Sequence, residues 1–161
     1  MFQHVLAINE LLLDLFVRVS EDLPEERLFH PSPGHGHSPA WIMGHLATTG
    51  EMGIRLLGGK IEHVRWLKLF GPGSTDQVPD DGSLSKSDLV NSTVQCYRQL
   101  RERTLLADPA GLNAPHSVEL LQGTPIRTQG DLLAHLLSSH FAIHLSQLSS
   151  CRRSEGHRAL F

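Results

Sequence analysis

Two histidines one helical turn apart lie in an apolar segment near the C-terminus. The segment reads DLLAHLLSSHFAIHLSQLSSCRR, and the pair is His140 and His144. Residues four apart lie on one face of a helix, so both imidazoles could bind the same metal ion. The HExxH motif of zinc proteases has a glutamate after its first histidine, but Phe141 stands there in this chain. The spacing therefore favours a metal site that is not a zinc-protease site.

A third ligand must come from a distant part of the chain, which holds 11 histidines. His45 lies in PAWIMGHLATTGEM, on the apolar stripe of a second predicted helix. A histidine on that stripe would point into the interior of a helical bundle, and Gly44 beside it allows close approach of a neighbour. We therefore take His45, His140 and His144 as the candidate metal ligands.

Other histidines fit the same site less well. His135 precedes His140 by five residues, which rotates it about 140° away on a regular helix, so we expect a supporting or core role. His35 and His37 form a rival pair, HGH, on a glycine-rich loop, where we expect both to face solvent. An inward histidine is also common as a hydrogen-bonded core residue, so a plain structural bundle without metal remains an alternative.

Three neutral imidazoles leave positions open on an ion, as in catalytic rather than structural metal sites. A divalent ion can lower the pKa of bound water towards neutrality, and it can bind a thiol as the thiolate. The first property would serve a hydrolase and the second a thiol-dependent transferase. The sequence does not choose between these two reactions.

Residues that flank the candidate ligands have more ordinary expected roles. Glu51 follows His45 by six residues, about 240° around the helix, so we expect it to be a solvated side chain and not a general base. Gln147 lies one turn beyond the C-terminal pair, and we expect it to make a structural contact. Trp41 and Trp66 could line a pocket, although core packing or a contact with a covering loop is the simpler expectation.

Four segments with helical spacing of apolar residues position these side chains. They cover residues 2–20, 39–57, 85–108 and 128–153, and Ser38 and Thr128 are suitable N-caps for the second and fourth. Between them, IEHVRWLKLF is expected to form a short helix and SVELLQGTPI a short extended segment. The pattern predicts an all-α four-helix bundle with long crossover connections, in one domain spanning residues 1–161.

Composition excludes several classes of partner. The formal net charge is -3 and no block of like charges occurs, so we expect no nucleic-acid partner. The apolar runs are too short to span a bilayer, and we expect no membrane association. Glu10 and Asp14 interrupt the first apolar segment, which does not read as a signal peptide, and Cys96 and Cys151 form no motif. We therefore expect a cytoplasmic protein with free thiols.

The two histidine segments also resemble a known family. Gly44-His45-Leu46, followed at a distance by the HFAIHLSQ stretch that contains His140 and His144, is similar to the motifs of the DinB/YfiT-like superfamily of four-helix metalloproteins. The similarity extends over most of the chain. One departure is Ser146, where the family often has glycine before the glutamine; serine is small enough to disturb packing only mildly.

The resemblance implies a four-helix bundle that holds a divalent ion, usually nickel or zinc, through three histidines. Carried over to this chain, these are His45, His140 and His144. It also implies a homodimer and a small-molecule substrate. Relatives include transferases and isomerases that use low-molecular-weight thiols, and others described as metal-dependent hydrolases. A metal-binding stress-response or ligand-binding module without turnover remains the alternative.

Overall fold

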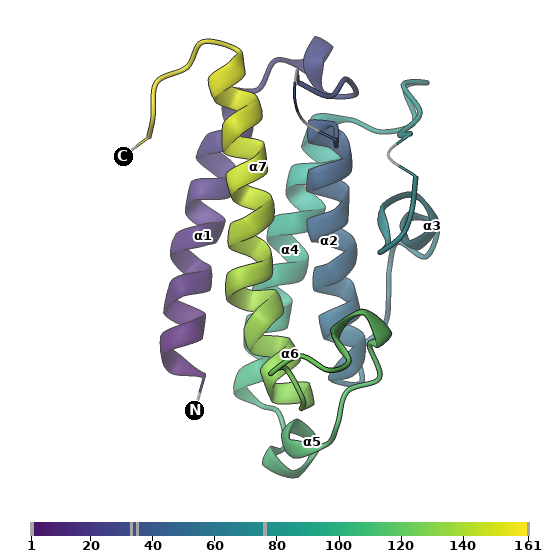
Figure 1. The fold of residues 1–161 in the computed structure, drawn as a ribbon, viewed down its shortest axis with the longest axis vertical. Coiled ribbons are helices and arrows are strands. Elements are labelled where there is room, and N and C mark those ends of the chain that lie inside the picture. The colour runs from purple at the N-terminus through teal and green to yellow at the C-terminus, as the bar shows by residue number, and fades with distance from the viewer. Residues whose placement is uncertain (1, 33, 35, 76, 161) are drawn as a thin grey trace.

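The computed structural model describes residues 2–32, 34, 36–75 and 77–160. Its long helices pack side by side as an all-α bundle, which confirms the predicted fold class (Figure 1). The bundle helices are α1 (Gln3–Glu21), α2 (Pro39–Leu56), α4 (Lys86–Leu105) and the continuous run of α6 (Gln129–His135), a π-helical turn (Leu136–His140) and α7 (Phe141–Ser154). α1 packs against α4 and α7, and α2 packs against the same two helices.

Side-chain caps fix where three of these helices begin. The hydroxyl of Ser38 accepts a hydrogen bond from a backbone N–H in the first turn of α2. Ser85 with Asp88, and Thr128 with Asp131, form capping boxes at the starts of α4 and α6. Each cap satisfies backbone N–H groups that have no partner inside the helix. The expected helix starts at 38, 85 and 128 are therefore correct to within a residue.

The contact between α2 and α4 depends on glycine. A Cβ atom at Gly50 would lie 2.5 Å from the sulfur of Cys96, and one at Gly53 would lie 2.9 Å from a methyl carbon of Leu100. Such separations are below van der Waals contact, so only glycine lets the two helices approach this closely. This close packing holds α2, the helix that carries His45, firmly against the bundle.

Two crossover connections carry short elements outside the bundle. The first holds α3 (Trp66–Phe70), which lies beside α2 (Figure 1). The second holds α5 (Pro109–Asn113), which the sequence did not predict, and a 3-10 turn (Glu119–Leu121) where an extended segment was expected. That expectation is wrong, because extended pairing here is limited to one bridge between Pro115 and Thr128. Among the described residues, no helix is both long and apolar enough to cross a bilayer.

A π-helical turn interrupts the last long helix next to the candidate ligands. The buried amide of Asn9 donates a hydrogen bond of 2.8 Å to the carbonyl oxygen of Leu137, and the hydroxyl of Tyr97 lies 3.5 Å from the carbonyl oxygen of Leu136. Carbonyl groups in a π turn are displaced from ordinary α-helical partners. Side chains from α1 and α4 therefore stabilise the wider turn that ends at His140.

Candidate metal centre

The structure brings together the three histidines that the sequence singled out. His45 comes from α2, His140 ends the π-helical turn and His144 lies in the first turn of α7. One ring nitrogen from each lies within 4.8 Å of those of the other two. Two segments about 95 residues apart in the chain therefore converge on one point inside the bundle.

The ring of His45 is held on both sides. Its Nδ1–H donates a hydrogen bond of 2.6 Å to the carbonyl oxygen of Phe70 in α3, which leaves a lone pair on Nε2. The indole of Trp41, one turn earlier in α2, stacks on the imidazole at 4.6 Å with an angle of 9° between the planes. The Trp41 Nε1–H in turn donates to the hydroxyl of Ser74. Trp41 thus lines the centre and does more than fill the core.

The ring of His144 is oriented by Gln147. The Nδ1–H of His144 donates a hydrogen bond of 2.8 Å to the amide oxygen of Gln147, one turn later in α7. Metal-binding histidines commonly donate their second ring N–H to an acceptor of this kind, which fixes the tautomer. The structural role expected for Gln147 is therefore specific: it holds a candidate ligand so that Nε2 can face the centre.

The nitrogens of His45 and His140 face each other directly. Their Nε2 atoms lie 3.2 Å apart, and the His45 nitrogen carries a lone pair because its proton is on Nδ1. Two such atoms repel unless a proton or a cation lies between them. Two nitrogen ligands of a tetrahedral zinc ion lie roughly 3.4 Å apart, given bonds of about 2.0–2.1 Å. The observed separation fits an ion of this size.

Burial keeps these imidazoles neutral. Desolvation, followed by repulsion from His144, lowers the pKa of His140 to about 3. Desolvation, followed by repulsion from His45, lowers the pKa of His144 to about 4, and desolvation also lowers the pKa of His45. At neutral pH all three rings therefore offer lone pairs and no positive charge. A set of three imidazoles suits zinc, nickel, copper or iron better than magnesium or calcium.

His135 lies closer to the centre than regular helical geometry predicts. The π turn between it and His140 makes residues five apart line up, and the two ring centroids are 5.5 Å apart in an edge-on contact. The expected 140° separation is therefore wrong. His135 is still outside the group of three, and its Nδ1 is hydrogen-bonded to the hydroxyl of Ser139 at 2.7 Å. Its ring packs against the ring of His140, in agreement with a supporting role.

Glu51 is buried, contrary to the expectation of a solvated side chain. Only 4% of it is exposed, and its Oε1 accepts a hydrogen bond of 2.5 Å from Nδ1 of His63. Its Oε2 accepts from the backbone N–H groups of Glu62 and His63, each at 3.1 Å. Glu51 therefore anchors the start of the connection that leads to α3. It does face away from the three histidines, as its rotation on the helix predicted.

The same connection reaches the centre through aromatic contacts. The ring of His63 stacks on Trp66 at 4.3 Å, and Trp66 meets the ring of Phe70 edge-on at 5.4 Å. The carbonyl of Phe70 is the group that holds His45. Trp66 is 9% exposed and belongs to the core, as expected. One feature of the sequence could have indicated these contacts: Glu51 lies on an apolar helix, next to a glycine.

Of the HGH pair, His35 lies outside the described residues. His37 is half-buried, and its ring stacks on Trp41 at 3.8 Å with an angle of 10°. The expectation that His37 faces solvent is therefore wrong. Its proximity contributes a repulsive effect that lowers the pKa values of His45 and His144.

A family model described as the DinB superfamily matches residues 9–148, a span that includes all three histidines. The chain belongs to the DinB superfamily. No curated protein matches it. The family assignment agrees with the resemblance drawn from the two histidine motifs, and the helical bundle of this DinB-superfamily protein agrees with the family fold.

A cavity of about 600 Å³ opens next to the histidine group of the DinB-superfamily protein. His140 and His135 form part of its lining. This cavity has no signal in the sequence, because its walls come from both crossover connections as well as from the bundle helices. A molecule in the cavity would lie within reach of the candidate metal centre.

Proposed function

We propose that this DinB-superfamily protein binds a divalent ion, nickel or zinc, through His45, His140 and His144, and that it is an enzyme acting on a small molecule. The observation that carries the proposal is the pair of Nε2 atoms 3.2 Å apart, with the third ring nitrogen within 4.8 Å. Phe70 and Gln147 orient two of the rings, so little ordering is required when an ion binds.

The proposed reaction class is thiol-dependent transfer or hydrolysis. When bound, the ion would lower the pKa of a thiol or of water and so supply a nucleophile at neutral pH. In transfer, the sulfur of a low-molecular-weight thiol forms a bond to an electrophilic carbon, a leaving group departs with its electron pair, and the thiol proton goes to solvent. The residues of the chain would hold the reactants in the cavity next to His140.

A binding module without turnover is the second candidate function. The supporting observation is that the described metal-binding group contains imidazoles alone, and that the carboxylate of Glu51, on the same helix as His45, is occupied by three hydrogen bonds. A carboxylate used in this way is not free to act as a general base. Such a module would keep the metal site and the cavity but would release its ligand unchanged.

Metal analysis tests the metal site. Tag-free protein reconstituted with zinc or nickel should bind about one equivalent, whereas His144→Ala should bind much less. His4→Ala is the matched control, because His4 is an exposed histidine in α1 and should leave the metal content unchanged. Less than about 0.2 equivalents in the wild-type protein would contradict the metal site.

Turnover separates the two candidate functions. Monochlorobimane with glutathione or cysteine should give a fluorescent thioether at a rate that depends on the metal, and p-nitrophenyl acetate would report hydrolysis. Metal-dependent turnover that is lost in His144→Ala supports an enzyme. One equivalent of bound metal with no turnover of either kind supports the non-catalytic module.

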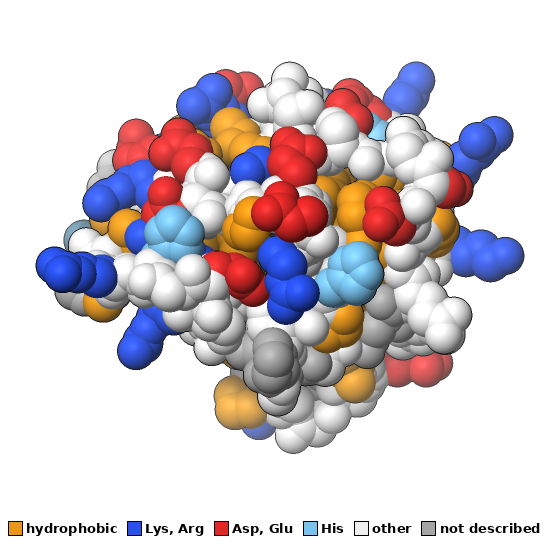
Figure 2. Space-filling model, turned by 90° about the horizontal axis from the view of Figure 1, so that it is seen from above, with side chains coloured by type: hydrophobic (Ala, Val, Ile, Leu, Met, Phe, Trp, Pro, Cys, Tyr) orange, Lys and Arg blue, Asp and Glu red, His pale blue; other side chains and the backbone are white. Residues whose placement is uncertain are grey.

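We also propose that the protein forms a homodimer through α1 and α7. Ile8 and Leu11 on α1 and Ile143 on α7 are about half exposed or more, at 48%, 60% and 54%. These helices pack on each other, so the exposed side chains can form one apolar surface. Sedimentation should show a dimer that Leu11→Glu converts to a monomer. Acidic and basic side chains are intermingled on the end of the bundle seen in Figure 2.

A further inference from the structure

The cavity next to the candidate metal centre is a long groove with mostly aliphatic walls. Met52 and Leu56 line it from α2, and Leu132 and Leu136 line it from α6 and the π turn. These positions follow helical spacing, so each helix turns one apolar stripe towards the cavity. A ligand that fills this groove must therefore have an apolar body.

The groove runs from the histidine group to the C-terminal end of α2. Arg55 lies ten residues after His45, about 15 Å further along that helix. Leu132 lies eight residues before His140, about 12 Å along the neighbouring helix, which runs in the opposite direction (Figure 1). Arg55, Leu132 and His140 line the cavity, and His45 lies next to His140 in the histidine group. The histidine group and Arg55 therefore lie at opposite ends of the groove.

Arg55 is the charged group of this groove. Its side chain is exposed and makes no hydrogen bond or ion pair with any described residue. The other described residues of the lining include no lysine, aspartate or glutamate, so Arg55 is the group there that carries a fixed charge. A guanidinium in this position matches a planar carboxylate, which it can bind through two parallel hydrogen bonds.

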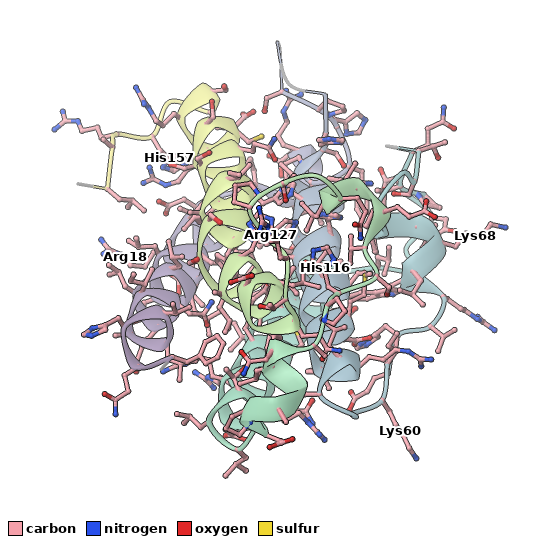
Figure 3. The ribbon with its side chains drawn as sticks, turned by 60° about the horizontal axis from the view of Figure 1, so that its bottom comes forward. Arg18, Lys60, Lys68, His116, Arg127 and His157 are labelled. Atoms are coloured by element: carbon pink, nitrogen blue, oxygen red, sulfur yellow. The ribbon has the colours of Figure 1, made fainter. Side chains whose placement is uncertain are left out.

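A loop from the second crossover covers the groove. Val118, Leu120 and Leu121 contribute to the lining, yet Leu120 is 80% exposed and would be covered by a ligand. The loop is held at its base by His116, whose Nε2–H donates to the carbonyl of Ile126 and whose Nδ1 accepts from Val118. Figure 3 shows His116 on this loop. The loop thus has a fixed base and an apolar tip over the groove.

We infer that the groove binds an amphipathic carboxylate, with the carboxylate paired to Arg55, the apolar body between α2 and α6, and the reacting group at His140. The inference deepens the proposed function, on which it rests for the chemistry at the His140 end, and it names the substrate class of the site. The binding itself depends on the groove and on Arg55, and it needs no metal ion.

Calorimetric titration with octanoate and with its uncharged analogue octanamide tests the inference. Metal-free wild-type protein should bind octanoate roughly tenfold more tightly than octanamide, since a charged hydrogen-bonded pair stabilises one complex only. Arg55→Gln should abolish this preference and leave octanamide binding unchanged. Arg98→Gln is the matched control, because Arg98 is also an exposed arginine and lines a different pocket. Leu120→Glu should weaken octanoate binding by placing a negative charge at the rim.

The inference would be overturned by no binding of either probe, by equal affinity for both, or by a preference that survives Arg55→Gln. Repeating the titration with zinc-loaded protein and with His144→Ala identifies a carboxylate that binds the ion instead. In that case, the preference appears only with zinc and disappears in His144→Ala, and the inference is also overturned. An Arg55-dependent preference in a protein that binds no zinc would support the groove and reject the proposed metal function, so the two failures are distinguishable.

Discussion

The Nδ1 atom of His45 lies 2.6 Å from the carbonyl oxygen of Phe70, and this contact joins a crossover helix to the candidate metal centre. The contact requires a position in α2 that has no side chain. A Cβ atom at Gly44 would lie 2.6 Å from three carbons of the Phe70 ring, which is fully buried. Gly44 thus lets Phe70 approach the helix backbone, whereas the sequence had suggested only that it allows a neighbouring element to come close.

Gly44→Ala should therefore weaken metal binding without removing a ligand. The Phe70 ring must move away from the new methyl group, and its carbonyl then no longer holds His45. Loss of such an orienting partner typically lowers metal affinity by about 10–100-fold. Competition with a zinc chelator measures the affinity. Gly111→Ala is the control, because a Cβ at Gly111 would meet no atom within 4 Å. Unchanged affinity in Gly44→Ala would show that the Phe70 contact is not needed.

Gln147 offers a second test of ligand orientation. Gln147→Leu removes the acceptor of the His144 Nδ1–H, so zinc affinity should fall by about 10–100-fold. Gln147→Glu keeps an acceptor at the same place and should retain the affinity or raise it, because a carboxylate makes the imidazole a more basic ligand. Chelator competition again measures the effect. Equal losses in both variants would indicate that the side chain matters for packing and not for the hydrogen bond.

The metal-free protein should lose stability on mild acidification. The pKa values of His140 and His144 fall from 6.5 to about 3 and about 4 in the folded protein. Below pH 6.5 these two imidazoles therefore bind protons in the unfolded chain but remain neutral in the folded protein. The free energy of unfolding consequently decreases as pH falls. The stability associated with the two neutral imidazoles is fully present above pH 6.5 and is progressively lost down to about pH 3.

Urea denaturation of metal-free protein between pH 7.5 and pH 4.5 measures this dependence. His140→Gln removes one of the depressed groups and should flatten the decrease in the urea midpoint with falling pH. His4→Gln, which changes an exposed histidine in α1, should keep the wild-type slope. A wild-type midpoint that is constant over this range would contradict the lowered pKa values.

The bundle and the histidine group were predictable because short-range rules decide them. Ser38, Ser85 and Thr128 cap helices by contacts within three residues, and HxxxH spacing places two imidazoles on one face. His45 followed from its place on an apolar stripe. The extent of a single domain over residues 1–161, the dimer and the reaction remain predictions.

What the sequence did not reveal depends on contacts between distant residues. The π turn before His140 is stabilised by Asn9, 128 residues away from its partner Leu137, so its effect on His135 has no local signal. The burial of Glu51 depends on the backbone N–H groups of Glu62 and His63, which lie before α3 and outside any helix. A carboxylate with three donors can be buried at little cost, and helical rotation alone does not report such donors.

Glu51 gives the last prediction, because it holds the connection that positions Phe70. Glu51→Ala leaves the N–H groups of Glu62 and His63 and the ring N–H of His63 without their acceptor. Hydrogen bonds to a charged group are worth about 1.5–3 kcal/mol each, so the loss of three should lower the free energy of unfolding by roughly 4 kcal/mol or more. The loosened connection should also lower zinc affinity, although Glu51 does not face the metal centre.

The matched control is Glu62→Ala, in the same connection. The side chain of Glu62 is exposed, and only its backbone N–H contacts Glu51, so the free energy of unfolding should change by less than about 0.5 kcal/mol. Urea denaturation measures the stability of both variants, and chelator competition measures their zinc affinity. If Glu51→Ala lowers stability but leaves zinc affinity intact, the aromatic contacts from His63 through Trp66 do not transmit the position of Glu51 to His45.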